Sequence, residues 1–152
     1  VMEPVIIRFN WLDPENAGDL PLPTYHSVQA SGMDVAAAVT EPVQVAPGEI
    51  KMIPTNFAVA IPPGFEIQVR PRSGLAIKHG VTVINSPGTI DADYRGEVKI
   101  GLSKIGLEVY TIQRGDRVAQ LVVGAVQKAD LQLVEELDKT VRQAGGFGQT
   151  GK

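Results

Sequence analysis

The chain has 152 residues and a formal net charge of −3 at pH 7, which suits a single domain that buries about 70% of the surface its unfolded chain exposes. No run of lysines or arginines interrupts this acidic balance, which argues against a nucleic-acid or membrane-surface protein and favours a small molecule as the partner. The absence of cysteine excludes disulfides, zinc–thiolate sites and thiol nucleophiles.

The first residues show no signal-peptide layout, and no apolar run approaches the roughly 18 residues of a membrane span. We therefore expect a soluble, cytoplasmic protein. The first predicted strand is Val5–Phe9, and a turn-rich segment with three prolines follows from Asp13 to Pro23. Further on, Asp34 stands one residue before an apolar strand start, where Gly32 allows close backbone approach. A plain turn leading into a strand is the alternative.

Two strand patterns occupy the middle of the chain. Met52–Phe65 contains no charged residue, so we expect a strand that is buried on both faces. Phe65–Arg70 alternates apolar and polar residues, as a half-buried strand does. Together with turn residues that recur along the whole chain, these patterns predict an all-β sandwich or barrel.

Little helix is expected. The candidates are a short turn at Ser73–Lys78 and, more weakly, Asp130–Leu137. Ser73 could cap the first of these, and Arg70 and Arg72 precede it, so free N–H groups and guanidinium groups together would favour an anion such as phosphate. A capped helix with solvated charges fits the same residues equally well.

The most informative stretch is Asn85–Gly96, which lies between the strand-like runs Val81–Ile84 and Glu97–Leu102. This arrangement predicts a β-hairpin that carries charge. If the backbone is extended there, Asp91 and Asp93 share one face, where they could bind a cation or act as acid and base. Ordinary turn chemistry of aspartate is the alternative.

Two features remain near the C-terminus. Gln120 interrupts the apolar strand Arg117–Val126, and a buried amide must be satisfied by backbone or belong to a site; we favour the site. The segment Arg142–Lys152 has four glycines around one phenylalanine and is expected to be mobile when nothing is bound.

Five of these stretches occur in the order and spacing of the motifs of the trimeric deoxyuridine triphosphatases, so the chain resembles that family from about Ser31 to Lys152. The stretches are Ala30–Val35, Arg70–Gly80, Gly88–Gly96, Arg114–Leu121 and Arg142–Gly151. The resemblance implies a jelly-roll-like β-sandwich or distorted barrel with one short helix and a flexible C-terminal tail. It also implies a homotrimer with shared active sites and Mg²⁺-dependent hydrolysis of dUTP to dUMP and pyrophosphate.

The same resemblance divides the chain and assigns roles to residues. Residues 1–141 would form the catalytic domain, and residues 142–152 a flexible arm that is part of the active site. Asp91 resembles the base that deprotonates the water attacking the α-phosphorus, and Tyr94 the tyrosine under the deoxyribose that leaves no room for a 2′-hydroxyl. Asn85 with its hairpin backbone resembles the uracil reader. The substrate-binding residues implied in this way are Arg72, Ser73, Gly74, Asn85, Thr89, Ile90, Tyr94, Lys99, Gln120, Arg142, Phe147 and Gly148.

For the metal, the resemblance implies that Asp34 and Gln120 hold waters of Mg²⁺ and that no protein group is a direct ligand. This suits an ion that keeps several waters and takes its direct ligands from substrate phosphates. Two positions depart from the family pattern: Gln149, which puts one phosphate contact in doubt, and Lys104, which concerns the sheet.

Two rival functions remain open. A deoxycytidine triphosphate deaminase shares the fold in family terms, but it would carry a Ser-Ser and Arg signature where this chain has Ser73-Gly74, and it would use a glutamate base. An inactive binding relative is the other rival, although a pure scaffold has no need of Asp91, Tyr94, Arg142 and Phe147 together.

Overall fold

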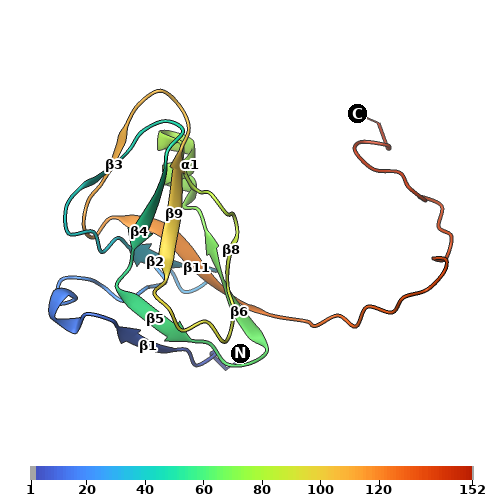
Figure 1. Cartoon of the computed structure of the whole chain (residues 1–152), viewed down its shortest axis with the longest axis horizontal. Coiled ribbons are helices and arrows are strands. Elements are labelled where there is room, and N and C mark those ends of the chain that lie inside the picture. Colours follow the sequence, from blue (N-terminus) through green and yellow to red (C-terminus); the bar gives the residue numbers. More distant parts are fainter. Residues whose placement is uncertain (1–2, 152) are drawn as a thin grey trace.

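The computed structural model describes residues 3–151, which fold mostly as short antiparallel strands with one α-helix, so the all-β prediction is confirmed (Figure 1). The elements in chain order are β1 (Arg8–Trp11), a 3-10 turn (Pro14–Asn16), β2 (Met33–Ala36), β3 (Val43–Val45), β4 (Ile50–Pro54), β5 (Phe57–Ala60), β6 (Phe65–Arg70), α1 (Ser73–His79), β7 (Val81–Val83), β8 (Gly88–Ile90), β9 (Lys99–Lys104), β10 (Tyr110–Ile112) and β11 (Arg117–Ala125).

Within residues 3–151 the strands form four antiparallel sheets. The largest has the order β2-β11-β6-β8, the next has the order β4-β9-β7, and β1-β5 and β10-β3 form two-stranded sheets. Their inward side chains belong to one buried cluster, in which Ile67 and Leu121 of the first sheet join Ile53 and Leu102 of the second. Each such side chain contributes about 1.5–3 kcal/mol when it is fully buried. This shared core holds the layers together.

The short helix is confirmed and begins at Ser73 as predicted, but the expectation that Ser73 caps it is wrong. Arg72 occupies the N-cap position and makes no side-chain cap bond, while Ser73 is the first helical residue. The helix ends at His79, and the residue that follows and caps it, Gly80, has a φ of 65°. A Cβ at this position would lie 2.2 Å from the Ile105 carbonyl oxygen, so both the left-handed backbone and the space require glycine.

The second helix predicted, over Asp130–Leu137, is wrong. No helix forms there, and Leu131 and Leu133 are almost fully exposed. A helix of this length depends on packing an apolar face, and this segment has no surface of its own chain to pack on.

The single strand predicted over Met52–Phe65 is also wrong. β4 ends at Pro54 and β5 begins at Phe57, and the two strands belong to different sheets. Between them Asn56 has a φ of 65°, which ends the extended backbone. The absence of charge reflects burial on either side of this turn, because Thr55 is 1% and Phe57 2% exposed.

Other strand boundaries shift by a few residues. The first strand is Arg8–Trp11 rather than Val5–Phe9, because these four residues are the ones that pair with β5. The last strand, β11, ends one residue before the predicted strand Arg117–Val126. Lys104 ends β9 as a buried residue, and its ammonium group donates a hydrogen bond of 2.5 Å to the Ile105 carbonyl.

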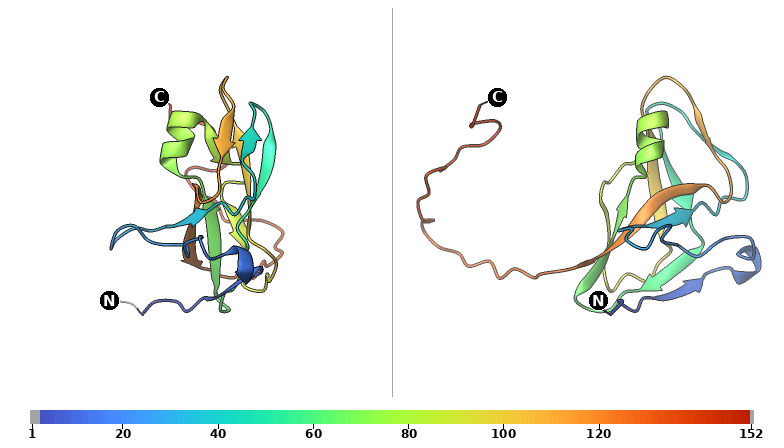
Figure 2. Two further views of the ribbon diagram at one scale, coloured as in Figure 1. Left: turned by 90° about the vertical axis from the view of Figure 1, so that its left-hand side faces the viewer. Right: turned by 180° about the vertical axis from the view of Figure 1, so that it is seen from behind.

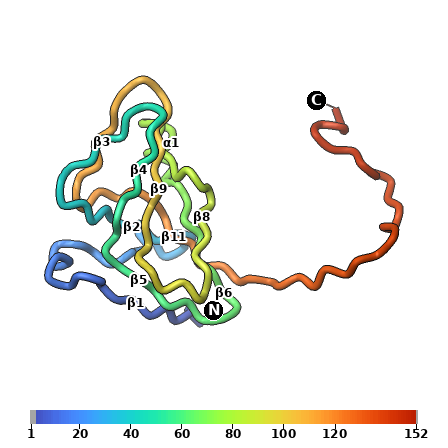
Figure 3. The backbone as a smooth tube through the Cα atoms, in the orientation of Figure 1, coloured from blue at the N-terminus to red at the C-terminus, as the bar shows by residue number. Residues whose placement is uncertain are grey.

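The C-terminal segment leaves the body of the molecule. The backbone N–H of Val126 still donates to the Gly64 carbonyl, after which the chain runs as an extended path away from the strands (Figures 1 and 3, and Figure 2, right). Within residues 3–151 no helix is long and apolar enough to cross a membrane. The division of the chain into a domain of residues 1–141 and an arm of residues 142–152 stays a prediction. Residues 1, 2 and 152 lie outside the part of the chain that the structure describes.

Candidate active site

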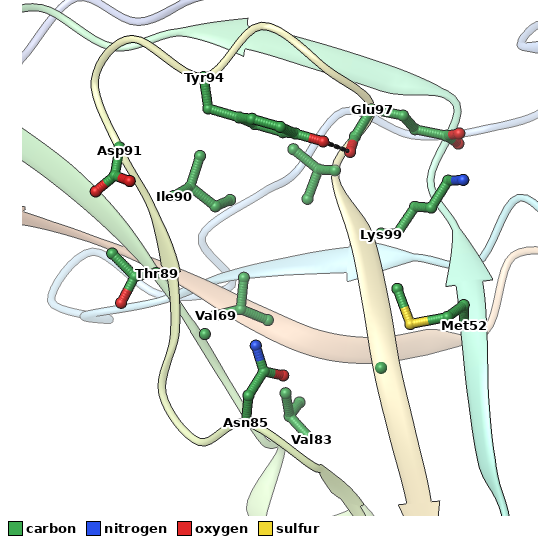
Figure 4. Close-up of a pocket in the computed structure, with 13 residues that line it drawn as sticks. Met52, Val69, Val83, Asn85, Thr89, Ile90, Asp91, Tyr94, Glu97 and Lys99 are labelled. Carbon is green, nitrogen blue, oxygen red and sulfur yellow. Dashed lines mark hydrogen bonds between the residues drawn. The ribbon is translucent and has the colours of Figure 1, made fainter.

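The predicted charged hairpin is present and forms a cavity. β7 pairs antiparallel with β9, while β8, between them in sequence, pairs with β6 of the other sheet. The loop from β7 to β9 is therefore stretched between two sheets, and it encloses a cavity of about 270 Å³ (Figure 4). The predicted residues that line it are Asn85, Thr89, Ile90, Asp91, Tyr94 and Lys99.

Asp91 stands at the rim of this cavity, directly after β8. The backbone turns there, because the Tyr94 N–H donates to the Asp91 carbonyl at 3.1 Å and the Arg95 Nη1 donates to the Ala92 carbonyl at 2.6 Å. The expectation that Asp91 and Asp93 share one face of an extended strand is therefore wrong. Asp91 lines the cavity and is exposed to solvent, whereas Asp93 does not line it.

Asn85 lies at the opposite end of the cavity from Asp91 (Figure 4). Two glycines, Gly88 and Gly101, leave free space beside the Asn85 amide that a larger side chain would fill. A Cβ on Gly88 would lie 3.2 Å from the Asn85 Nδ2, and a Cβ on Gly101 would lie 3.9 Å from its Oδ1. An amide offers one acceptor and two donors, so a flat polar ring edge could pair with it there.

Tyr94 forms another wall of the cavity. Its ring extends from the Asp91 side toward Glu97, and its hydroxyl donates a hydrogen bond of 2.9 Å to the Glu97 carbonyl (Figure 4). The ring therefore offers the cavity a carbon surface, because its polar atom already has a partner.

A second group of predicted residues gathers around Asp34, whose carboxylate is 13% exposed. The group lies where β2 and β11 pair, with Asp34 opposite Gln120. The Asp34 carboxylate lies 3.6 Å from the Arg72 Nε and 3.3 Å from the Arg117 Nη1, which form ion pairs with it, and the His26 Nε2 is 3.4 Å away. Such a group combines one carboxylate with two guanidinium groups and one imidazole.

The same register brings Gln120 and the start of α1 to this group. A Cβ on Gly32 would lie 2.4 Å from the Gln120 Oε1, so the amide occupies the space that Gly32 leaves open. Arg72 donates a hydrogen bond of 2.9 Å to the Arg117 carbonyl and places Ser73 and Gly74 next to the group. Arg70 turns away instead and donates to the Gln68 Oε1, so it does not flank the helix start as expected.

The remaining predicted residues, Arg142, Phe147 and Gly148, lie on the C-terminal segment, away from both groups (Figure 1). The Arg142 Nε donates to the Gly145 carbonyl at 2.6 Å, and the Phe147 side chain is fully exposed. Gln149 folds back onto this turn, because a Cβ on Gly145 would lie 2.7 Å from its Cγ. One chain therefore places the predicted residues in three separate regions.

Sequence reasoning missed several wall residues. Those lining the cavity are Met52, Val69, Val83, Gly88, Glu97, Val98 and Gly101, and His26 and Arg117 belong to the second group. The apolar wall residues look like ordinary core positions in the sequence. Glu97 and Arg117 could have been found from the sequence, since each is a charged residue at the start of a largely apolar stretch.

Comparisons with known proteins agree on one family. The family model described as dUTPase matches residues 19–151. The chain is 57% identical over 145 residues to the deoxyuridine 5'-triphosphate nucleotidohydrolase of Desulfotalea psychrophila, covering 95% of this chain and 97% of that protein.

Solved structures give the same family. The dUTPase of Staphylococcus bacteriophage 80alpha with dUPNHPP is 26% identical, with a TM-score of 0.81 over 97% of this chain and 99% of that one. A mutant dUTPase from phage phi11 of S. aureus, described with a structural Mg(II) ion, shares the fold at 24% identity, with a TM-score of 0.76 over 88% and 99% of the two chains.

Proposed function

This chain belongs to the dUTPase family, and we propose that it hydrolyses dUTP to dUMP and pyrophosphate with Asp91 as the general base. The observation that carries the role of Asp91 is its position on the rim of the cavity that Asn85 and Tyr94 also line. A cavity of about 270 Å³ matches a nucleoside rather than a whole triphosphate, so base and sugar occupy it and the phosphates extend past its rim.

In this proposal each group of lining residues contacts a different part of the nucleotide. Asn85 and the backbone of Thr89 and Ile90 pair with the polar edge of uracil. Tyr94 lies under the deoxyribose, and Lys99 stands on the cavity wall. The Asp91 carboxylate takes a proton from a water molecule whose oxygen forms a bond to the α-phosphorus, while the bond from that phosphorus to the bridging oxygen breaks and pyrophosphate leaves.

The phosphates are bound by the other predicted residues. Arg72, Ser73, Gly74 and Gln120 approach them from the Asp34 group, and Arg142, Phe147 and Gly148 from the C-terminal segment. Guanidinium forks suit phosphate oxygens, and an aromatic ring suits the face of a base. Holding the triphosphate in line with the water supplies much of the rate enhancement, because phosphoryl transfer depends chiefly on positioning and charge neutralisation.

The residues present fit a magnesium ion that is bound through water. Within residues 3–151 no group of three His, Asp or Glu side chains is close enough to hold a metal directly. Asp34 and Gln120 offer one carboxylate and one amide side by side, which is too few for direct coordination and sufficient to hold metal-bound waters. When bound to the triphosphate, Mg²⁺ neutralises phosphate charge.

A homotrimer with shared active sites would unite the three regions. In one chain the Asp34 group and the hairpin cavity share no residue, and the C-terminal segment extends away from the strands (Figure 1). Its apolar side chains are exposed, with Leu131 at 92% and Leu137 at 83%. A neighbouring copy supplies the missing surface for them. The cytoplasmic location expected from the sequence stays a prediction.

The test is pyrophosphate release from dUTP, dTTP, dCTP and UTP, with and without Mg²⁺. We expect Mg²⁺-dependent turnover of dUTP alone, because a site built to pair with one base edge leaves buried groups unpaired with another, which is worth roughly 10⁴-fold. Ammonia release from dCTP would establish the deaminase instead. Binding of dUTP without turnover would establish an inactive relative.

A further inference from the structure

Tyr94 is held in place by the residues that follow it. Its hydroxyl donates to the Glu97 carbonyl at 2.9 Å, the bond drawn in Figure 4. A Cβ on Gly96 would lie 2.5 Å from the Tyr94 Oη and 2.7 Å from its Cζ, closer than such atoms approach in proteins. The end of the ring therefore fills the space of a side chain at position 96, and only glycine leaves that space free.

Glu97 is held in turn by Asn56. The Asn56 N–H donates to the Glu97 Oε2 at 2.9 Å, and this contact is partly buried. Asn56 has a φ of 65°, a backbone conformation whose cost the surrounding contacts must offset. Its side chain supplies them, because it accepts from the Asp13 N–H and donates to the Asp13 carbonyl, both at 2.9 Å.

These contacts form one continuous path. It runs from the Asp13 turn through Asn56 to the Glu97 carboxylate, along the backbone to the Glu97 carbonyl, and from there to the Tyr94 hydroxyl. The ring is thus fixed from two sides, by a hydrogen bond at its polar end and by the absence of a side chain at Gly96. A ring held in this way cannot swing aside to admit a larger sugar without breaking a bond of the path.

We propose that Gly96 and Glu97 are positioning residues that set the sugar specificity of the site by fixing Tyr94. The proposal rests on the proposed function, in which Tyr94 lies under the deoxyribose. Because the Tyr94 hydroxyl is already bonded to the Glu97 carbonyl, the ring face gives a 2′-hydroxyl neither space nor a hydrogen-bond partner. A site that cannot pair a polar group rejects the ligand that carries it.

The experiment measures kcat/KM for dUTP and for UTP in wild type and four variants. Gly96→Ala forces the ring aside and should lower the dUTP to UTP ratio at least about tenfold. Glu97→Ala removes the acceptor for the Asn56 N–H and should lower the ratio by a smaller factor. Glu97→Gln keeps an acceptor oxygen at that place and should keep most of the ratio. Gly18→Ala is the matched control, because a Cβ there meets nothing within 4 Å.

The ratio separates positioning from a merely structural role, since general loss of structure lowers kcat/KM for both nucleotides together. If Gly96→Ala does not fold, as judged by melting, Tyr94→Phe is measured in its place. It removes the hydrogen bond from the Tyr94 hydroxyl to the Glu97 carbonyl without adding volume, and it should also lower the ratio. The proposal is overturned if the dUTP to UTP ratio is unchanged in Glu97→Ala and is also unchanged in Gly96→Ala or in Tyr94→Phe. That result would leave the proposed hydrolysis of dUTP standing. A wild type that fails to prefer dUTP over UTP overturns the proposed role of Tyr94 as well.

Discussion

A general base acts through an oxygen that accepts a proton, so Asp91→Asn separates the shape of this residue from its basicity. The amide keeps the position on the cavity rim and should leave folding and dUTP binding intact. We expect hydrolysis at least ~100-fold slower, the lower end of a general-base effect. Single-turnover kinetics with dUTP, together with a binding measurement, would check this.

Asp93→Asn is the matched control for that variant. Asp93 follows Asp91 by two residues in the sequence, is exposed, and does not line the cavity, so its neutralisation should leave turnover close to wild type. Wild-type turnover in Asp91→Asn, or an equal loss in both variants, would contradict the assignment of Asp91 as base.

A second residue-scale prediction concerns stability and pH. The Arg114 Nε and Nη2 donate to the two Asp19 carboxylate oxygens at 2.8 and 2.9 Å, and these hydrogen bonds lower the pKa of Asp19 below its ordinary value. The bonds therefore stabilise the fold above the ordinary pKa of aspartate, and this contribution is lost as the pH falls through the lowered pKa.

Melting of Asp19→Asn and wild type between about pH 7 and about pH 2 tests this. Wild type should melt higher near neutral pH by a few degrees at most, because the pair is exposed and screened by solvent. The difference should close in acid. A difference that is constant across the range would show that the ionised carboxylate is not the cause.

At the scale of elements, the C-terminal segment is predicted to act as a lid. The hydrogen bonds at Arg142, Gln143 and Gln149 are local, reaching partners three residues away. Deleting everything after Val141 should therefore leave the melting temperature and the oligomer nearly unchanged. It should lower kcat by roughly 100-fold or more, because closure over the nucleotide excludes water and completes the phosphate contacts.

Melting, sedimentation and dUTP kinetics of the truncated chain, measured side by side with the full chain, decide the matter. Full activity would show that the segment has no catalytic part. Collapse of the oligomer would show that it is structural. A loss confined to KM would place its contacts in ground-state binding rather than in the transition state.

For the whole molecule, we predict a trimer of about three times the 16.2 kDa chain. Apolar side chains such as Leu133, at 101% exposure, and Leu131, at 92%, lie open to solvent in a single chain. Burying large apolar surfaces of this kind is the main driving force for association. Light scattering at micromolar concentration gives the mass directly, and a monomer would rule out shared sites.

The sequence determined the all-β character, the short helix after Arg72, the hairpin with Asp91, and the family. Alternation of apolar and polar residues reports whether a strand is buried on one face, and Gly and Pro mark where it ends. Periodicity alone does not point to a function, whereas the residue types and order of the five motifs identify the family and the residues of its site.

Only the tertiary structure decided which strands pair, and therefore which residues line the cavity together. Thr55 and Asn56 look like part of one apolar run until β4 and β5 join different sheets, and Asp93 seems equivalent to Asp91 until the backbone turns. Met52 and Val69 become cavity walls because β4 pairs with β9 and β6 with β8. Such pairings depend on contacts between residues far apart in the chain, and a local pattern of polarity carries no information about them.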